Sequence, residues 1–118
     1  MSGIDDLIDT YCLAWSAPDP QERQRLLGLV WAEGATYTDP RADARDAQQL
    51  LAHIATVQAQ RPGAVVERTS RIDEHHGLGR FHWQVRLPDG STLPQGIDFF
   101  ELSDDRRIAR IVGFFGLL

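Results

Sequence analysis

Apolar side chains recur every three or four residues in two N-terminal segments, which is the spacing of one face of an α-helix. The first segment spans residues 4–15 and stops before a proline. The second begins at Asp19, a residue type that caps helices, and Pro20 follows at the first helical position. Its apolar positions continue to Trp31, and Gly34 is expected to end it. The first third of the chain therefore predicts two consecutive helices.

The next segments combine a short strand with a third helix. Residues 35–39 are expected to form the strand, which Pro40 closes, and residues 41–45 form a polar loop. The helical spacing returns from about residue 46 to residue 60, and Pro62-Gly63 ends it. Three helices thus precede most of the strands.

Beyond these helices the apolar period changes to two, which is the period of β-strands. The sequence predicts four strands, over residues 64–73, 78–87, 92–102 and 108–115. Their short connections favour an antiparallel meander. Three helices followed by such a sheet predict an α+β domain, in which the helices cover one face of a curved antiparallel sheet and enclose a cone.

Composition narrows the class of protein. The 118 residues suit a single domain over 1–118, and a hydrophobic fraction of 42% allows a buried core. The net charge of -5 argues against a nucleic-acid partner. The sequence has no apolar segment typical of a membrane span or leader peptide, and its single cysteine suits a reducing compartment, so a cytoplasmic location is expected. No residue spacing predicts a metal site or a bound cofactor.

Asp98 is the unusual residue of the third predicted long strand, because it lies between Ile97 and Phe99. Side chains alternate along a strand, so either Asp98 points into the cone or its two neighbours do. Burying an unpaired carboxylate is costly, whereas an outward aspartate is ordinary. Taken alone, this strand leaves both orientations open.

Three local signatures are spread over nearly the whole chain. They are Tyr11 within residues 9–14 (DTYCLA), the strand end Tyr37-Thr38-Asp39-Pro40, and residues 96–101 (GIDFFE) followed by a charged turn and the final strand. In this order they resemble the ketosteroid isomerases and the SnoaL-like polyketide cyclases, which share the nuclear transport factor 2-like fold. The resemblance implies the same cone-shaped fold, and it marks the fold better than any one activity.

The resemblance also implies an acid–base site. Asp39 matches the base that moves a proton on carbon, and Tyr11 and Asp98 match the two donors that stabilise an enolate oxygen. Asp98 donates only when protonated, which requires burial and a raised pKa. In the cyclases, the carboxylate at the matching late-strand position serves as the acid–base group. We therefore expect Asp98 to be buried and to lie within about 10 Å of Asp39.

Each of these residues also has a structural interpretation. Tyr11 lies on the apolar face of its predicted helix, where core packing is the commonest role of tyrosine. Asp39-Pro40 is a common turn pair. Arg41 could pair with Asp39 and so weaken it as a base.

The cone is expected to enclose a pocket for a small hydrophobic carbonyl compound. The implied activity is that of an isomerase or cyclase that needs no cofactor. A non-catalytic small-molecule-binding domain and an association module are the alternatives. The residues expected to line the pocket are Trp15, Tyr37, Ile54, Phe81, Trp83, Phe100, Ile111, Gly113 and Phe115.

An inward Asp98 has a consequence for the opposite face of the sheet. The alternating side chains Ile97, Phe99, Val112 and Phe114 would then form one exposed apolar patch. The simplest cover for such a patch is a second copy of the chain about a two-fold axis. The sequence therefore predicts a homodimer through the outer face of the sheet, with no nucleic-acid or membrane partner.

Overall fold

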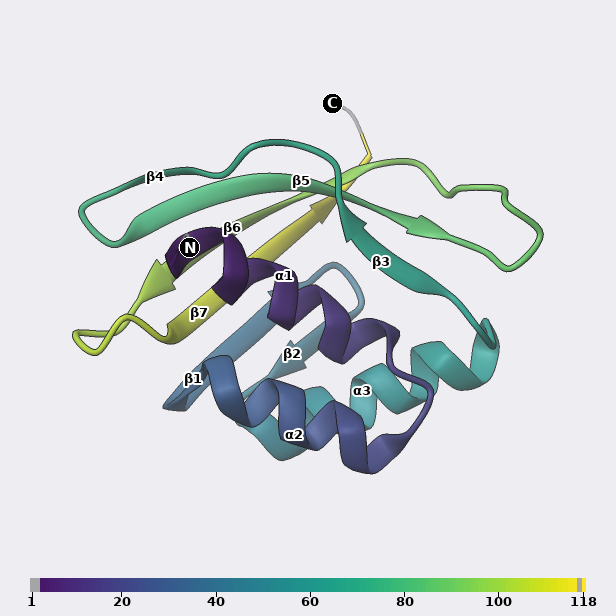
Figure 1. The fold of residues 1–118 in the computed structure, drawn as a ribbon, viewed down its shortest axis with the longest axis horizontal. Helices are drawn as coiled ribbons and strands as arrows, with labels where there is room; N and C mark the ends of the chain where they lie inside the picture. Colours follow the sequence, from purple (N-terminus) through teal and green to yellow (C-terminus); the bar gives the residue numbers. More distant parts are fainter. Residues whose placement is uncertain (1–2, 117) are drawn as a thin grey trace.

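Three helices lie on one side of a curved sheet in the computed structural model, which describes residues 3–116 and 118 (Figure 1). Helix α1 covers Gly3–Ser16, α2 covers Pro20–Val30 and α3 covers Ala47–Gln60. Helices α1 and α2 pack against each other, and α3 contacts the first two strands. None of the helices in the described part of the chain is long and apolar enough to cross a membrane.

The helix starts follow from local capping. The side chain of Asp19 accepts a hydrogen bond from the N–H of Gln21 at 3.2 Å, and that of Asp46 accepts from the N–H of Gln49 at 2.9 Å. Each aspartate satisfies an N–H group that has no partner inside its helix. The predicted starts of the second and third helices are confirmed.

The sheet has seven strands in the order β2-β1-β7-β6-β5-β3, and β4 also pairs with β5. The strands are β1 (Trp31–Asp39), β2 (Ala42–Ala44), β3 (Val65–Arg68), β4 (Asp73–His75), β5 (Leu78–Arg86), β6 (Gly96–Leu102) and β7 (Ile108–Phe115). Strands β3, β5, β6 and β7 form the predicted antiparallel meander. Strand β1 adds to β7 in parallel, so the sheet as a whole is mixed. The predicted α+β class, with a curved sheet over three N-terminal helices, is confirmed.

Strand β1 begins earlier than predicted. Trp31, expected on the second helix, is its first residue, and Gly34 lies inside the strand. Gly34 has φ of 79°, and the pairing of β1 with β7 changes register between Trp31 and Thr36. Glycine adopts this left-handed conformation without the strain that a side chain brings. Gly34 therefore forms a bulge in a strand, and the prediction that it ends the helix is wrong.

Two predicted element boundaries differ from the observed ones, and strand hydrogen bonding accounts for both differences. The segment 41–45, predicted as a loop, contains strand β2, which turns back antiparallel onto β1. The predicted strand 92–102 becomes regular only at Gly96. Pro94 lies in its first part and has no N–H to offer a neighbouring strand.

The predicted strand 64–73 is divided into β3 and β4, both of which pair with β5. Between them, the side-chain Oγ of Ser70 accepts the N–H of His82 at 2.8 Å. The hydroxyl of Ser70 thus replaces a main-chain carbonyl as the acceptor, and the regular main-chain pairing with β5 is interrupted at Ser70.

Three glycines stand directly opposite large side chains on a neighbouring strand. The pairs are Gly79 with Phe100, Gly96 with Trp83, and Gly113 with Asp98. A Cβ atom at any of these glycines would overlap the side chain that faces it. The absent Cβ lets a ring or a carboxyl group lie across the adjacent strand, which shapes the inward face of the sheet.

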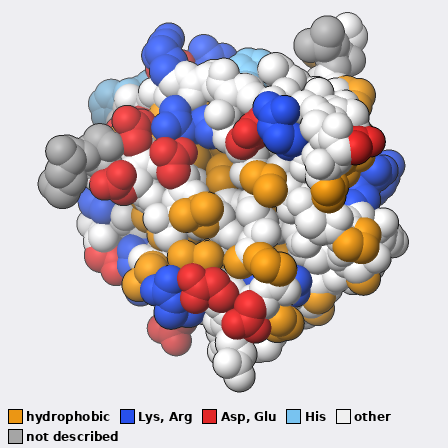
Figure 2. Space-filling view, turned by 45° about the vertical axis from the view of Figure 1, so that its right-hand side comes forward, with side chains coloured by type: hydrophobic (Ala, Val, Ile, Leu, Met, Phe, Trp, Pro, Cys, Tyr) orange, Lys and Arg blue, Asp and Glu red, His pale blue; other side chains and the backbone are white. Residues whose placement is uncertain are grey.

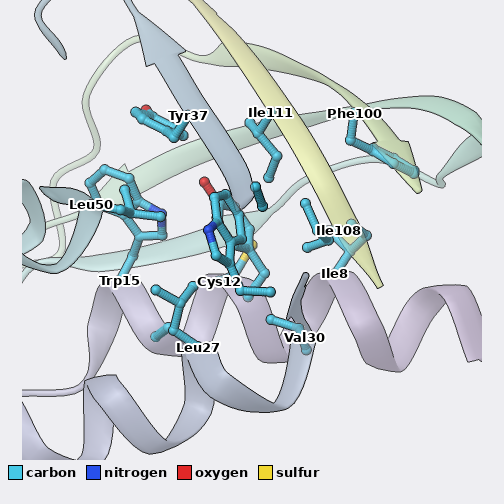
Figure 3. Close-up of a cluster of buried hydrophobic side chains, with 14 of the residues drawn as sticks. Ile8, Cys12, Trp15, Leu27, Val30, Tyr37, Leu50, Phe100, Ile108 and Ile111 are labelled. Atoms are coloured by element: carbon cyan, nitrogen blue, oxygen red, sulfur yellow. The ribbon is translucent and has the colours of Figure 1, made fainter. Parts of the chain in front are cut away.

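Side chains from both layers fill the space between helices and sheet (Figure 3). Ile8 of α1 and Leu27 of α2 are fully buried, as are Ile108 and Ile111 of β7. The close packing of these layers fixes the position of the inward-facing polar residues of the sheet.

Hydrophobic side chains also reach the surface among acidic and basic groups (Figure 2). Phe99 and Phe114 lie on neighbouring strands of the outward face, with ring centroids 6.0 Å apart. Val112 and Ile97 beside them are partly buried. The outward apolar patch that the sequence predicts is therefore present.

Replacing Gly79 with Ala is expected to lower the free energy of unfolding by about 1–3 kcal/mol, because the new Cβ overlaps the buried ring of Phe100. Gly28→Ala is the matched control. A Cβ at Gly28, in α2, meets nothing within 4 Å, so this change should be neutral or stabilise by up to ~1 kcal/mol. Urea unfolding measures both values, and equal effects of the two changes would contradict the packing described.

Candidate functional site

Asp98 points into the space between the sheet and the helices. It is 4% exposed, whereas its neighbour Phe99 is 42% exposed on the outward face. Of the two orientations that the sequence allows, the inward one is observed. Burial raises the pKa of the Asp98 carboxyl from 3.8 to about 7, while the hydrogen bond from Trp83 lowers this pKa and the charge of Asp39 raises it. The expected burial and raised pKa are both found.

One side chain holds the Asp98 carboxyl in place. The Nε1–H of Trp83 on β5 donates a hydrogen bond to Asp98 Oδ1 on β6 at 2.9 Å. The indole ring reaches this position by lying over Gly96. The sequence predicts Trp83 only as a wall of the pocket. Its contact with Asp98 is diagonal across two strands, so it depends on a register that the sequence alone does not provide.

Asp39 lies at the end of β1 and accepts hydrogen bonds at both carboxyl oxygens. The hydroxyl of Tyr37 donates to Oδ2, and the main-chain N–H of Arg41 donates to Oδ1 at 2.7 Å. Arg41 therefore does contact Asp39, but through its backbone. Its guanidinium lies over the ring of Phe115, 5.9 Å from the ring centroid.

His53 on α3 reaches the mouth of the site, a position that the sequence allows because His53 lies next to Ile54 on the third predicted helix, although it was not among the expected site residues. Its Nε2 lies 3.9 Å from Asp39 Oδ2, and its side chain is 22% exposed. Its ring packs near those of Trp15 and Tyr37. A signal was available, because His53 falls three residues after Leu50, on the buried face of the helix. Among the described residues, no group of three or more His, Cys, Asp or Glu could hold a metal ion.

Tyr11 is buried, and its hydroxyl has no hydrogen-bond partner among residues 3–116 and 118. Burial raises the pKa of Tyr11 well above 10, and the charge of Asp98 raises it further. The ring stacks on Trp31 with centroids 6.0 Å apart. A buried hydroxyl without an acceptor is unfavourable, so a polar group brought next to it would gain a hydrogen bond.

The acidic side chains meet above Gly113 of β7. A Cβ at this glycine would lie 2.7 Å from Asp98 Oδ1, 3.5 Å from Asp39 Cβ and 3.8 Å from Tyr37 Oη. Three side chains from two strands, β1 and β6, therefore converge on one point beside β7. The expected proximity of Asp39 to Asp98, within about 10 Å, is confirmed.

The residues predicted to line a pocket fall into two groups. Most belong to the packed core, and Trp83, Phe115 and Gly113 lie at the end of the sheet near Arg41. Phe115 is 43% exposed, and its ring meets that of Trp83 edge-on with centroids 5.8 Å apart. The residues in the core group are Trp15, Tyr37, Ile54, Phe81, Phe100 and Ile111.

The burial of the acidic residues bears on the enclosed cavity expected inside the cone. Tyr11 and Asp98 are almost inaccessible, so little free space adjoins them. Three hollows of the described chain have volumes of about 670, 460 and 270 Å³, and all three open to solvent. None of these three is lined by Tyr11 or Asp98, whereas Asp39 lines the first. Most of the residues expected to line the pocket are instead packed in the core.

Comparisons with known proteins give a consistent fold. No family model and no curated protein sequence matches the chain. A candidate isomerase of the SnoaL-like family from Agrobacterium tumefaciens superposes with a TM-score of 0.91 and 31% identity, over 99% of this chain and 100% of that one.

Two further solved structures share the fold at lower identity. A candidate polyketide cyclase from Sinorhizobium meliloti has a TM-score of 0.71 and 19% identity, over 96% of this chain and 99% of its own. A de novo designed protein with a curved β-sheet has a TM-score of 0.71 and 12% identity, over 98% of this chain and 88% of its own. Because a designed chain also adopts this shape, the shape by itself indicates no activity.

Replacing Asp98 with Asn is expected to change how stability depends on pH. The pKa of this carboxyl rises from 3.8 to about 7 on folding, so the folded chain binds more protons than the unfolded chain between these values. The free energy of unfolding of the native chain should therefore fall as pH rises through this window, by about 4 kcal/mol relative to the variant, and level off above it.

Denaturant unfolding at a series of pH values measures this difference. Asp104→Asn, at an exposed position in the turn between β6 and β7, is the matched control and should leave the pH profile unchanged. Parallel profiles for the native chain and Asp98→Asn would show that Asp98 titrates as an exposed aspartate does.

Proposed function

Because the chain belongs to the SnoaL-like family, we propose that it is an acid–base enzyme of the isomerase or cyclase type, which acts without a cofactor on a small hydrophobic carbonyl compound. One observation carries this proposal. A buried carboxyl with a raised pKa, Asp98, lies beside a second carboxyl, Asp39, and near a buried hydroxyl that lacks a partner, Tyr11. Perturbed acidic groups of this kind are typical of catalytic sites.

Two groups are suited to stabilise an enolate oxygen. The hydroxyl of Tyr11 has no acceptor among the described residues and is free to donate. Oδ1 of Asp98 accepts a hydrogen bond from the N–H of Trp83. When Asp98 is protonated, its proton is therefore on Oδ2, and this group can donate a hydrogen bond to a substrate oxygen. Donors held in an apolar interior stabilise developing charge more strongly than donors in water.

Asp39 is the proposed base. It removes a proton from the carbon next to the substrate carbonyl, and the electrons of the C–H bond form the C=C bond of the enolate. If the enolate is conjugated with a second C=C bond of the substrate, return of the proton to the far carbon of that bond moves the double bond and gives an isomer. Attack of the enolate carbon on a second carbonyl closes a ring instead. His53, near Asp39 and partly exposed, is placed to exchange that proton with solvent.

Access to these groups requires side chains to move. Trp83 and Phe115 occupy the end of the sheet nearest Arg41, and Phe115 is well exposed. A substrate ring that displaces Phe115 would come close to Trp83 and therefore to Asp98. A non-catalytic small-molecule-binding domain is the second candidate. It is favoured by the hydrogen bonds that both oxygens of Asp39 already accept within the fold, which occupy its carboxyl with protein groups.

Replacing Asp39 with Asn should abolish proton exchange on a true substrate, because an amide does not act as a base. The measurement is deuterium incorporation next to the carbonyl of small cyclic ketones in D₂O, followed by NMR. Tyr11→Phe should slow exchange roughly 100-fold by removing one donor. Asp43→Asn, at an exposed position on β2, is the control and should exchange normally. Full activity of Asp39→Asn would remove Asp39 from the mechanism.

The outward apolar patch supports a homodimer as the working form. Phe99 and Phe114 are 42% and 52% exposed on the outward face, beside Ile97 and Val112. An exposed group of this kind is uncommon on a monomer of this size. A second copy about a two-fold axis would bring the same patch against itself, and this makes the contact self-complementary.

Phe114→Glu should convert this dimer to a monomer, because a charge would be buried at the centre of the contact. Light scattering at micromolar concentration measures the mass. Leu13→Glu is the matched control, since Leu13 is similarly exposed at 55% but lies on α1 and should not affect association. A native chain that scatters as a monomer would rule out this interface.

A further inference from the structure

We propose that Arg41 binds an anionic group of the substrate, a carboxylate, at the entrance to the site. This inference rests on the proposed function, because it adds the chemical class and the orientation of the compound that enters the site. The guanidinium of Arg41 has no part in the proposed acid–base chemistry, and the inference gives it a role in binding.

The main chain fixes Arg41 beside the proposed base. Arg41 follows Asp39 by two residues in the tight turn between β1 and β2, and its N–H donates to Asp39 Oδ1 at 2.7 Å. This hydrogen bond ties the start of the Arg41 side chain to the carboxyl group of Asp39. Any group held by the guanidinium therefore lies within the reach of one arginine side chain from the base.

The guanidinium of Arg41 contacts an aromatic face and no acid. It lies 5.9 Å from the ring centroid of Phe115, and within residues 3–116 and 118 it has no carboxylate or carbonyl partner. The two other arginines that line the same hollow are paired, Arg45 with Asp43 at 3.1 Å and Arg110 with Glu101 at 3.4 Å. Of these three arginines, Arg41 is therefore the one without an acidic side-chain partner among the described residues.

A hollow also borders Arg41 on the outward face of β1 and β7. Its volume is about 670 Å³, and Thr36, Thr38, Asp39 and Arg41 are among the residues that line it. A planar guanidinium can bind both oxygens of a carboxylate in a fixed geometry, which an ammonium group cannot do.

The interior behind this entrance excludes negative charge. Asp98 and Asp39 already lie close together there, and their mutual repulsion contributes to the raised pKa of Asp98. A substrate carboxylate next to them would be both desolvated and repelled. An acidic substrate is therefore oriented with its carboxylate outward on Arg41 and its carbonyl end inward toward Tyr11.

The apolar body of such a substrate has a matching surface between these ends. Phe115 and Trp83 meet edge-on, and Phe115 lies directly under the guanidinium of Arg41. An aromatic or alicyclic ring can replace the contacts that Phe115 makes with Trp83. The substrate class that fits is a ring ketone that carries a carboxylate at the end away from the reacting carbonyl.

A matched pair of probes tests this assignment by binding alone. 2-Naphthoate and 2-acetylnaphthalene have the same ring system, and only the first carries a charge. Isothermal titration calorimetry of the native chain should show that naphthoate binds at least about 10-fold more tightly, as expected for a charge-assisted hydrogen-bonded pair. Arg41→Met should abolish this preference, and Arg41→Lys should retain part of it. Added salt should reduce the preference.

Arg45→Met is the matched control, because Arg45 lines the same hollow but is paired with Asp43. It should preserve the preference for naphthoate. Equal affinity of the two probes, a preference that survives in Arg41→Met, or no binding of either probe at millimolar concentration would each overturn the assignment. Neither probe has to react, so a chain without proton-transfer activity can still show the preference, and the two proposals fail separately.

Discussion

The whole site depends on one carboxyl group that is held away from water. Asp98 is buried between sheet and helices, with a hydrogen bond from Trp83 on one oxygen and a glycine opposite it on β7. A charge in that position is unfavourable, so the carboxyl keeps its proton to higher pH than an exposed aspartate does. The arrangement makes a side chain that is normally an acceptor available as a donor. Asp39 and Tyr11 are relevant to the chemistry because they lie near this carboxyl.

The packed interior stabilises the fold, but the same packing limits the access of a ligand to Asp98. The aromatic and aliphatic residues that the sequence suggests as a pocket lining form most of the core, and they leave little space beside Asp98. The side chains that can move at low cost are those near the end of the sheet, where Phe115 is exposed and Arg41 rests on its ring. Selectivity at this end would then be decided by residues that are not part of the proposed proton-transfer chemistry.

Much of this architecture could be predicted from local pattern, and the remainder could not for a physical reason. Helical and alternating spacing, together with the capping residues Asp19 and Asp46, predict the type and order of most of the elements. The position of Asp98 needed the family resemblance, because alternation alone allows either face. The hydrogen bond from Trp83, the place of His53 beside Asp39 and the parallel pairing of β1 with β7 all join distant segments. Such contacts are set by tertiary packing, which no short window of sequence contains.

The position of β7 in the sheet has a consequence for how the chain is made. β7 is hydrogen-bonded to β1 on one side and β6 on the other, although β1 leaves the ribosome much earlier. During synthesis, β1 and the meander therefore wait with unpaired strand edges, which are prone to pair with other chains. Gly113, above which Asp39 and Asp98 meet, also arrives with this strand. A nascent chain that has not yet produced β7 can pair β5 with β6, but it lacks the strand that joins β1 to β6, so Asp39 and Asp98 come together only when β7 is added.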